Sequence, residues 1–110
     1  MPDDLNYTHL AEQLKAVADP TRLRILRLLP PTKTCELVLN VSELAEKLDT
    51  PQPTVSHHLK VLHTAGIVQC EKMCRDVYYW IDKPALDAAM CAVKTLAKEQ
   101  TGEIQNPKSK

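Results

Sequence analysis

Apolar residues recur every three to four positions in five stretches of the chain, the spacing that places them on one face of a helix. This spacing predicts helices over residues 8–18, 20–29, 41–48, 52–65 and 84–98. After the fourth stretch the period changes to two, and residues 67–72 and 76–81 are rich in β-branched and aromatic side chains. These two segments predict an antiparallel hairpin whose tip is Met73-Cys74-Arg75. Residues 37–39 fit either a short strand or the entry to a helix.

Local signals mark where the predicted helices begin. Asp19 is a typical N-cap, and Pro20 after it suits the first position of a helix. The third helix has two candidate caps, which are Asn40, with Glu43 three residues on, and Ser42. The residues expected on buried faces are Leu10, Leu14, Val17 and Ala18; Leu23, Ile25, Leu26, Leu28 and Leu29; Val41, Leu44, Ala45 and Leu48; Val55, Leu59 and Leu62; and Leu86, Met90, Val93 and Leu96 or Ala97.

The order of these elements predicts the fold. Two short helices joined by a tight turn and followed by a hairpin are typical of a winged helix-turn-helix. The expected class is therefore mostly α with a small antiparallel β-hairpin (α+β). A chain of 110 residues has the size of one domain, which we assign to residues 1–99, with residues 100–110 as a flexible polar tail.

Charge is unevenly placed along the chain, although 14 basic and 14 acidic side chains give a net charge of zero. Residues 20–35 contain four basic side chains and no acid, and residues 50–70 contain one lysine, three histidines and no acid. Such stretches can lie beside the phosphates of a nucleic acid, or can simply be solvated faces.

The predicted helix over residues 52–65 has the composition of a helix that reads DNA. Gln52, Thr54, Ser56 and His57 are expected to touch bases or backbone, Lys60 to contact a phosphate, and Arg75 at the hairpin tip to reach the backbone or the minor groove. The remaining candidates are expected to be structural: His58 and His63 as solvent-facing or packing residues, Arg22 and Arg24 as braces, and Tyr78 and Tyr79 as packing residues of the hairpin.

Several runs of sequence resemble one known family. They are residues 18–26 (ADPTRLRIL), 41–48 (VSELAEKL), 51–62 (PQPTVSHHLKVL), 65–68 (AGIV) and 77–79 (VYY). In this order, over roughly residues 8–98, they are similar to the metal- and metalloid-sensing repressors of the ArsR/SmtB family. The resemblance implies a homodimer, joined through its first and last helices, that binds a palindromic operator and releases it when an inducer binds. The apolar stripes of those two helices agree, since a single chain of this size struggles to bury them.

The inducer site departs from the two placements best known in that family. Asn40 and Ser42 stand where the arsenic-type site has cysteines, and residues 83–99 lack the histidines of the zinc-type site. Sensing must then use Cys35, Cys70, Cys74 and Cys91, expected to be thiols or metal ligands rather than disulfides. Thiolates select thiophilic ions, here of the As(III)/Sb(III) or Cd(II)/Pb(II) class, while DNA binding itself needs no cofactor.

The closest pair of cysteines in the sequence is Cys70 and Cys74. On a straight strand, four residues span about 13 Å, whereas two sulfurs on one metal ion lie within about 4.6 Å. A long-stranded hairpin therefore separates the pair, and a wider loop over residues 71–74 would join it. The absence of glycine from the tip favours the wider loop. Cys91, on a polar flank of its helix, is either a ligand or a structural residue, and Cys35 lies in an accessible loop near Lys33.

Three other functions are weighed against a metal-responsive repressor. The same fold could respond to oxidation or persulfidation of its thiols, or could be a protein-interaction module with no DNA target. An enzyme is disfavoured because His57 and His58 lie on the helix expected to face DNA rather than in a pocket. No apolar run approaches the length of a membrane span, and Met1–Asp4 do not start a signal peptide, so we expect a cytoplasmic protein.

Overall fold

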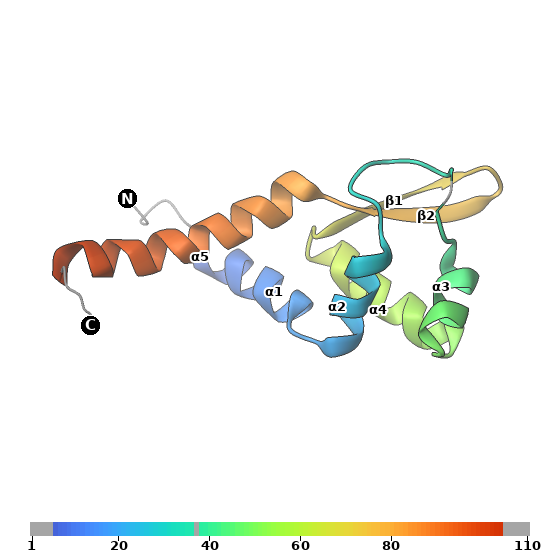
Figure 1. Cartoon of the computed structure of the whole chain (residues 1–110), viewed down its shortest axis with the longest axis horizontal. Coiled ribbons are helices and arrows are strands. Elements are labelled where there is room, and N and C mark those ends of the chain that lie inside the picture. Colours follow the sequence, from blue (N-terminus) through green and yellow to red (C-terminus); the bar gives the residue numbers. More distant parts are fainter. Residues whose placement is uncertain (1–5, 37, 105–110) are drawn as a thin grey trace.

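The computed structural model describes residues 6–36 and 38–104, with side chains described as far as residue 97. Its elements are α1 (Tyr7–Val17), α2 (Pro20–Leu28), α3 (Val41–Leu48), α4 (Gln52–Thr64), β1 (Val68–Met73), β2 (Asp76–Ile81) and α5 (Lys83–Ile104). Helices α1 to α4 form the body, the hairpin of β1 and β2 extends to one end, and α5 runs towards the other (Figure 1). The predicted winged helix-turn-helix order is confirmed.

One predicted helix end is wrong, and the described part of residues 37–39 takes neither of the two structures considered for it. Helix α5 continues to Ile104, so residues 100–104 are helical rather than part of a loose tail; residues 105–110 lie outside the described residues. Lys98, Glu99 and Gln100 are good helix formers, which allows the helix to pass Gly102. Residues 38 and 39 form neither a strand nor a helix, and residue 37 is not among the described residues.

Helix α3 begins at the first of its two candidate caps. The side chain of Asn40 accepts a hydrogen bond from the backbone N–H of Glu43 at 2.8 Å, and the Glu43 carboxylate accepts one from the N–H of Asn40 at 2.9 Å. This reciprocal capping box satisfies two N–H groups that the helix leaves without partners. Ser42, the other candidate, lies inside the helix and is exposed.

Replacing Asn40 with alanine removes this cap, and we expect the free energy of unfolding to fall by about 1 kcal/mol. Urea denaturation of the two proteins measures the difference. Ser42→Ala is the matched control, because an exposed side chain inside the helix should change stability by less than about 0.5 kcal/mol. An equal loss in both variants would contradict the assignment of the cap.

The core is centred on α4, whose predicted seam is confirmed. Val55, Leu59 and Leu62 are fully buried, together with Ile25, Leu44, Ile67 and Val68 from α2, α3 and the start of the hairpin. The prediction of burial is wrong for four residues of the single chain. Leu23, Met90 and Val93 are exposed, and so is Ala18, which follows the last residue of α1. In α1 the buried residues are Leu10, Gln13 and Ala16, and this helix contacts α2, α4 and α5.

The hairpin has long strands and a tight turn, so the expectation of a wider loop is wrong. Met73 pairs with Asp76 and Cys70 pairs with Tyr79. The two residues between the strands, Cys74 and Arg75, have positive φ angles of 51° and 82°, as in a type I′ turn. The cross-strand pairs extend to the tip and impose this turn even without glycine.

Candidate nucleic-acid interface and cysteine pair

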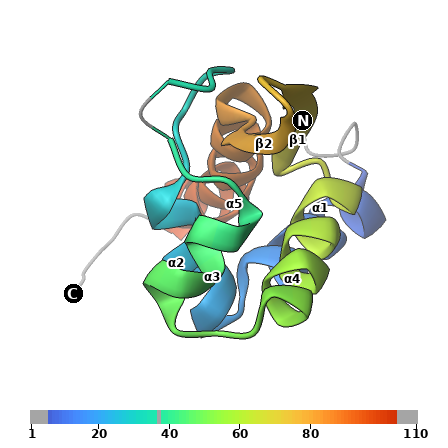
Figure 2. The ribbon, with the colours of Figure 1, turned by 90° about the vertical axis from the view of Figure 1, so that its right-hand side faces the viewer.

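Helices α3 and α4 are joined by a short turn that fixes their relative direction. Asp49 ends α3 in the left-handed conformation (φ 52°), and the N–H of Thr50 donates to the carbonyl of Ala45 at 3.0 Å. Pro51 then precedes α4 directly. Viewed from the hairpin end, the two helices lie side by side at the front of the molecule (Figure 2).

The two sides of α4 differ in their exposure to solvent. Val55, Leu59 and Leu62 face the core, and the outer side is free of acidic residues. All six residues predicted to contact DNA are exposed: Gln52, Thr54, Ser56, His57, Lys60 and, at the hairpin tip, Arg75. The start of α4 and the hairpin tip lie towards the same end of the molecule (Figure 1), as expected for a recognition helix and a wing that bind one duplex.

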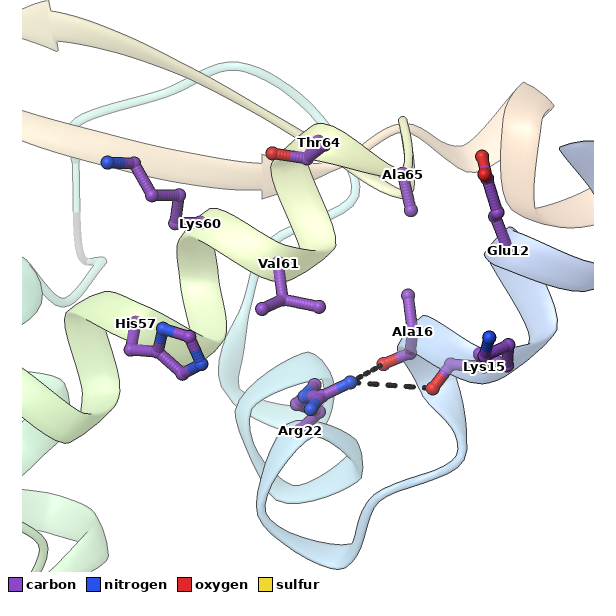
Figure 3. Close-up of a pocket in the computed structure, with 9 residues that line it drawn as sticks. All are labelled: Glu12, Lys15, Ala16, Arg22, His57, Lys60, Val61, Thr64 and Ala65. Carbon is purple, nitrogen blue, oxygen red and sulfur yellow. Dashed lines mark hydrogen bonds between the residues drawn. The ribbon is translucent and has the colours of Figure 1, made fainter.

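Arg22 braces the helices, as predicted. Its Nη1 donates to the carbonyls of Ala16 at 3.1 Å and Lys15 at 3.4 Å, at the end of α1. Its Nε donates to Nδ1 of His58 in α4 at 3.1 Å, so His58 is a packing residue. These bonds lie beside a groove between α1 and α4 (Figure 3), lined by Glu12, Lys15, Ala16, Arg22, His57, Lys60, Val61, Thr64 and Ala65. The bond to His58 joins residues 36 positions apart, and sequence periodicity gave no sign of it.

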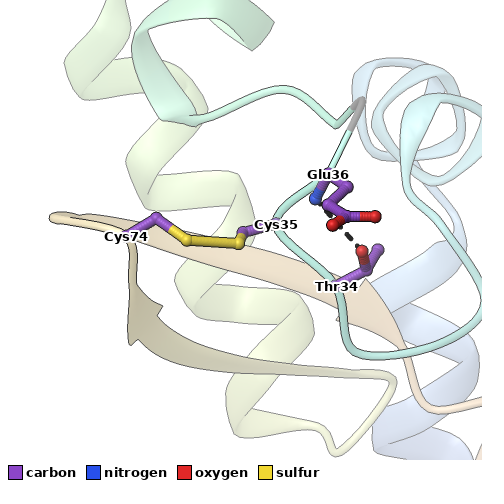
Figure 4. The surroundings of a disulfide bond; sticks show 4 residues. All are labelled: Thr34, Cys35, Glu36 and Cys74. Carbon is purple, nitrogen blue, oxygen red and sulfur yellow. Dashed lines mark hydrogen bonds between the residues drawn. A yellow bond between two sulfur atoms is a disulfide. The ribbon is translucent and has the colours of Figure 1, made fainter.

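The cysteines are arranged differently from the prediction. Cys35 and Cys74 form a disulfide, with their Cα atoms 6.8 Å apart (Figure 4), so the expectation of free thiols is wrong for this pair. Cys70 and Cys74 stand four residues apart on an extended strand and its turn, and the wider loop that would join them is absent. Cys70 and Cys91 are free. Within residues 6–36 and 38–97, no three histidine, cysteine or acidic side chains gather into a metal site.

Cys35 reaches the wing because the segment between α2 and α3 runs along the hairpin. The carbonyl of Pro30 accepts a hydrogen bond from the N–H of Ile81 at 2.9 Å. Further on, Lys33 forms an ion pair of 2.7 Å with Glu71. The disulfide then joins this segment, which we call the α2–α3 loop (residues 29–36 and 38–40), to the wing tip.

The other two cysteines have different surroundings. Cys70 is half-buried and lies opposite Tyr79, where burial raises the pKa of the tyrosine hydroxyl and the adjacent thiol raises it further. Cys91 is exposed on α5. Within the described residues, neither free thiol belongs to a group of three potential metal ligands.

Comparison with known proteins identifies the family. Residues 19–69 match the model of a family described as "Bacterial regulatory protein, arsR family". An HTH-type transcriptional regulator of Methanocaldococcus jannaschii is 43% identical over 75 residues, which cover 68% of this chain and 80% of that protein. The chain belongs to the ArsR family. The arsenical resistance operon repressor of Staphylococcus xylosus is 34% identical over 83 residues, covering 76% of this chain and 75% of the relative.

The solved structures agree with this ArsR-family assignment. An ArsR-like transcriptional regulator from Rhodococcus sp. RHA1 superposes with a TM-score of 0.75 at 25% identity, covering 88% of this chain and 87% of the other. The chain spans about half the length of the SmtB repressors that it also matches, 47% of the one from Mycobacterium tuberculosis and 49% of the one from Synechocystis.

The chain is thus a DNA-binding transcriptional repressor with the winged helix-turn-helix fold, and not an enzyme. This confirms the resemblance seen in the sequence. It also decides against an interaction module with no DNA target. Over the described residues, no helix is both long enough and apolar enough to cross a membrane.

Proposed function

We propose that this ArsR-family protein is a homodimer that represses transcription from a palindromic operator and releases it when cysteine thiolates bind a thiophilic ion of the As(III)/Sb(III) or Cd(II)/Pb(II) class. The observation that carries the proposal is the meeting of Cys35 and Cys74 at the wing tip, next to Arg75. The proposal keeps the cytoplasmic location expected from the sequence, because the partner is DNA.

The reduced pair suits an ion with a high affinity for sulfur. With Cα atoms 6.8 Å apart, the two side chains can place their sulfurs within the roughly 4.6 Å that a shared metal ion allows. Soft thiolate ligands select thiophilic ions over Mg²⁺ or Ca²⁺. A relative named as an arsenical resistance operon repressor supports this class of inducer. Cys70 and Cys91 remain candidates for the further ligands.

The position of the pair suggests how the ion would act on DNA binding. Cys74 and Arg75 are the two central residues of the wing turn, and Cys35 belongs to the α2–α3 loop that leads into the helix-turn-helix. An ion held by both thiolates would set the wing tip relative to that loop. A wing fixed away from its DNA-bound position loses its contacts with the backbone, and the operator is released.

Replacing Cys35 and Cys74 with serine is expected to leave operator affinity unchanged and to abolish its response to the inducer. The operator fragment is first selected from random-sequence DNA by the wild-type protein. Fluorescence anisotropy then follows release under a phosphine reductant, with arsenite or Cd²⁺ as the added ion. The single substitutions Cys91→Ser and Cys70→Ser are controls that report whether either thiol takes part in binding the ion. Release that persists unchanged in the Cys35→Ser, Cys74→Ser variant would refute the site.

A second candidate function is favoured by the disulfide itself. Two thiols that become a disulfide give up two protons and two electrons, which peroxide accepts as it is reduced to water. Peroxide without metal then releases the operator from the wild-type protein and not from the serine variant. If arsenite and Cd²⁺ have no effect under strict reduction while peroxide releases the DNA, the switch is redox rather than metal-dependent.

A further inference from the structure

We propose that Arg22 is a positioning residue for operator recognition, because it fixes the recognition helix α4 to the end of α1 through His58. The inference concerns DNA binding, which the family assignment shows, and is independent of the cysteine switch. It rests on the hydrogen bonds that one guanidinium group makes to two helices.

The first half of the connection is at the end of α1. The carbonyls of Lys15 and Ala16 lie in the last turn of α1, and the Lys15 carbonyl also accepts a hydrogen bond from the backbone N–H of Ala18 at 3.3 Å. Arg22 donates to both, and its positive charge also suits the negative end of the helix. Figure 3 shows the guanidinium reaching these two carbonyls across the gap between the helices.

The second half is at α4. Arginine has only donors, so Nδ1 of His58 is the acceptor and the ring carries its proton on Nε2. The apolar seam holds α4 against the core, but apolar contacts have little directional preference. The bond to His58 is directional, and it fixes the rotation of α4 at the position next to His57. A small rotation there would displace the side chains that read the bases.

Arginine is needed because its donors point in two directions from one rigid plane. Nη1 serves α1 while Nε serves α4, and a lysine ammonium has no such fixed fork. Arg22 is itself held at the start of α2. Its backbone N–H donates to the Asp19 carboxylate at 3.1 Å, and this bond lowers the pKa of Asp19, so the cap stays ionised. Arg22 is therefore held in place at the start of α2 while its side chain bonds to α1 and α4.

The test separates positioning from direct DNA contact and from simple stability. Arg22→Lys keeps the charge and loses the fork, and His58→Leu removes the acceptor. We expect both to weaken operator binding by about tenfold to a hundredfold, the effect of losing a hydrogen bond to a charged group. Binding to a non-specific duplex should be unchanged, as should the slope of log affinity against log salt, since no phosphate contact is lost. His58→Asn restores an acceptor near the Nδ1 position and should recover most of the operator affinity.

Lys60→Ala is the comparison for a true phosphate contact, which should weaken specific and non-specific binding alike and reduce the salt slope by about one. Three results would overturn the proposal. They are wild-type operator affinity in Arg22→Lys and His58→Leu, an equal loss on non-specific DNA, or a loss in His58→Asn as large as in His58→Leu. Thermal unfolding is recorded for each variant, and if His58→Leu does not fold, Arg22→Lys and His58→Asn still decide.

Discussion

Replacing Ser56 and His57 together with alanine is expected to abolish operator binding while the protein stays folded. Both side chains are exposed on the outer side of α4, opposite the seam of Val55, Leu59 and Leu62. Alanine is a good helix former, so α4 should keep its structure. Each lost base contact costs about 1–3 kcal/mol, so two together should weaken operator binding by at least about thirtyfold. Anisotropy on the selected operator fragment measures the loss.

The matched control is His63→Ala, an exposed histidine in the last turn of the same helix. It should bind the operator within about twofold of wild type, since surface changes away from a contact have small effects. Non-specific binding should survive in the double variant, because it depends mainly on Lys60 and other charges. Operator binding by the double variant at wild-type affinity would show that another element reads the DNA.

The sequence was informative about α4 because the information there is local. The positions of Val55, Leu59 and Leu62 follow from helical periodicity alone, and the structure buries all three. The cap of α3 is also local, since Asn40 and Glu43 are three residues apart. The exposed side of α4, which we propose to face DNA, could thus be predicted as the complement of the buried side.

The cysteine pair could not be predicted in the same way. Cys35 and Cys74 are 39 residues apart, and their meeting depends on the path of the α2–α3 loop along the hairpin. That path is set by contacts such as the hydrogen bond from Ile81 to Pro30, which no local rule indicates. The prediction of a wider loop at the hairpin tip was wrong for a related reason. Cys74 and Arg75 adopt positive φ angles against their own preference because the strand pairing around them determines the register.

The exposed apolar residues of α5 show a third kind of limit. The spacing of Leu86, Met90 and Val93 predicted one apolar face, and Leu86 does pack against the core. Met90 and Val93 are each 38% exposed, although Ala89 beside them is buried. Periodicity reports that a face is apolar, but it does not say whether the chain covers that face itself or a second copy does.

Replacing Met90 and Val93 with glutamate is therefore expected to convert the proposed dimer into a folded monomer. Neither side chain is in the core of the single chain, so the protomer should keep its fold. In a dimer, the same carboxylates would be buried without partners, at a cost of several kcal/mol. Two linked half-sites gain about a hundredfold or more in affinity over one, so operator binding should fall by at least that factor. Sedimentation velocity and anisotropy measure the two effects.

Lys94→Glu on the polar flank of α5 is the control, because it changes the net charge by the same two units and should leave the dimer intact. A dimer that persists in the double glutamate variant would place the interface elsewhere, and a variant that unfolds would assign Met90 and Val93 to the core of the protomer.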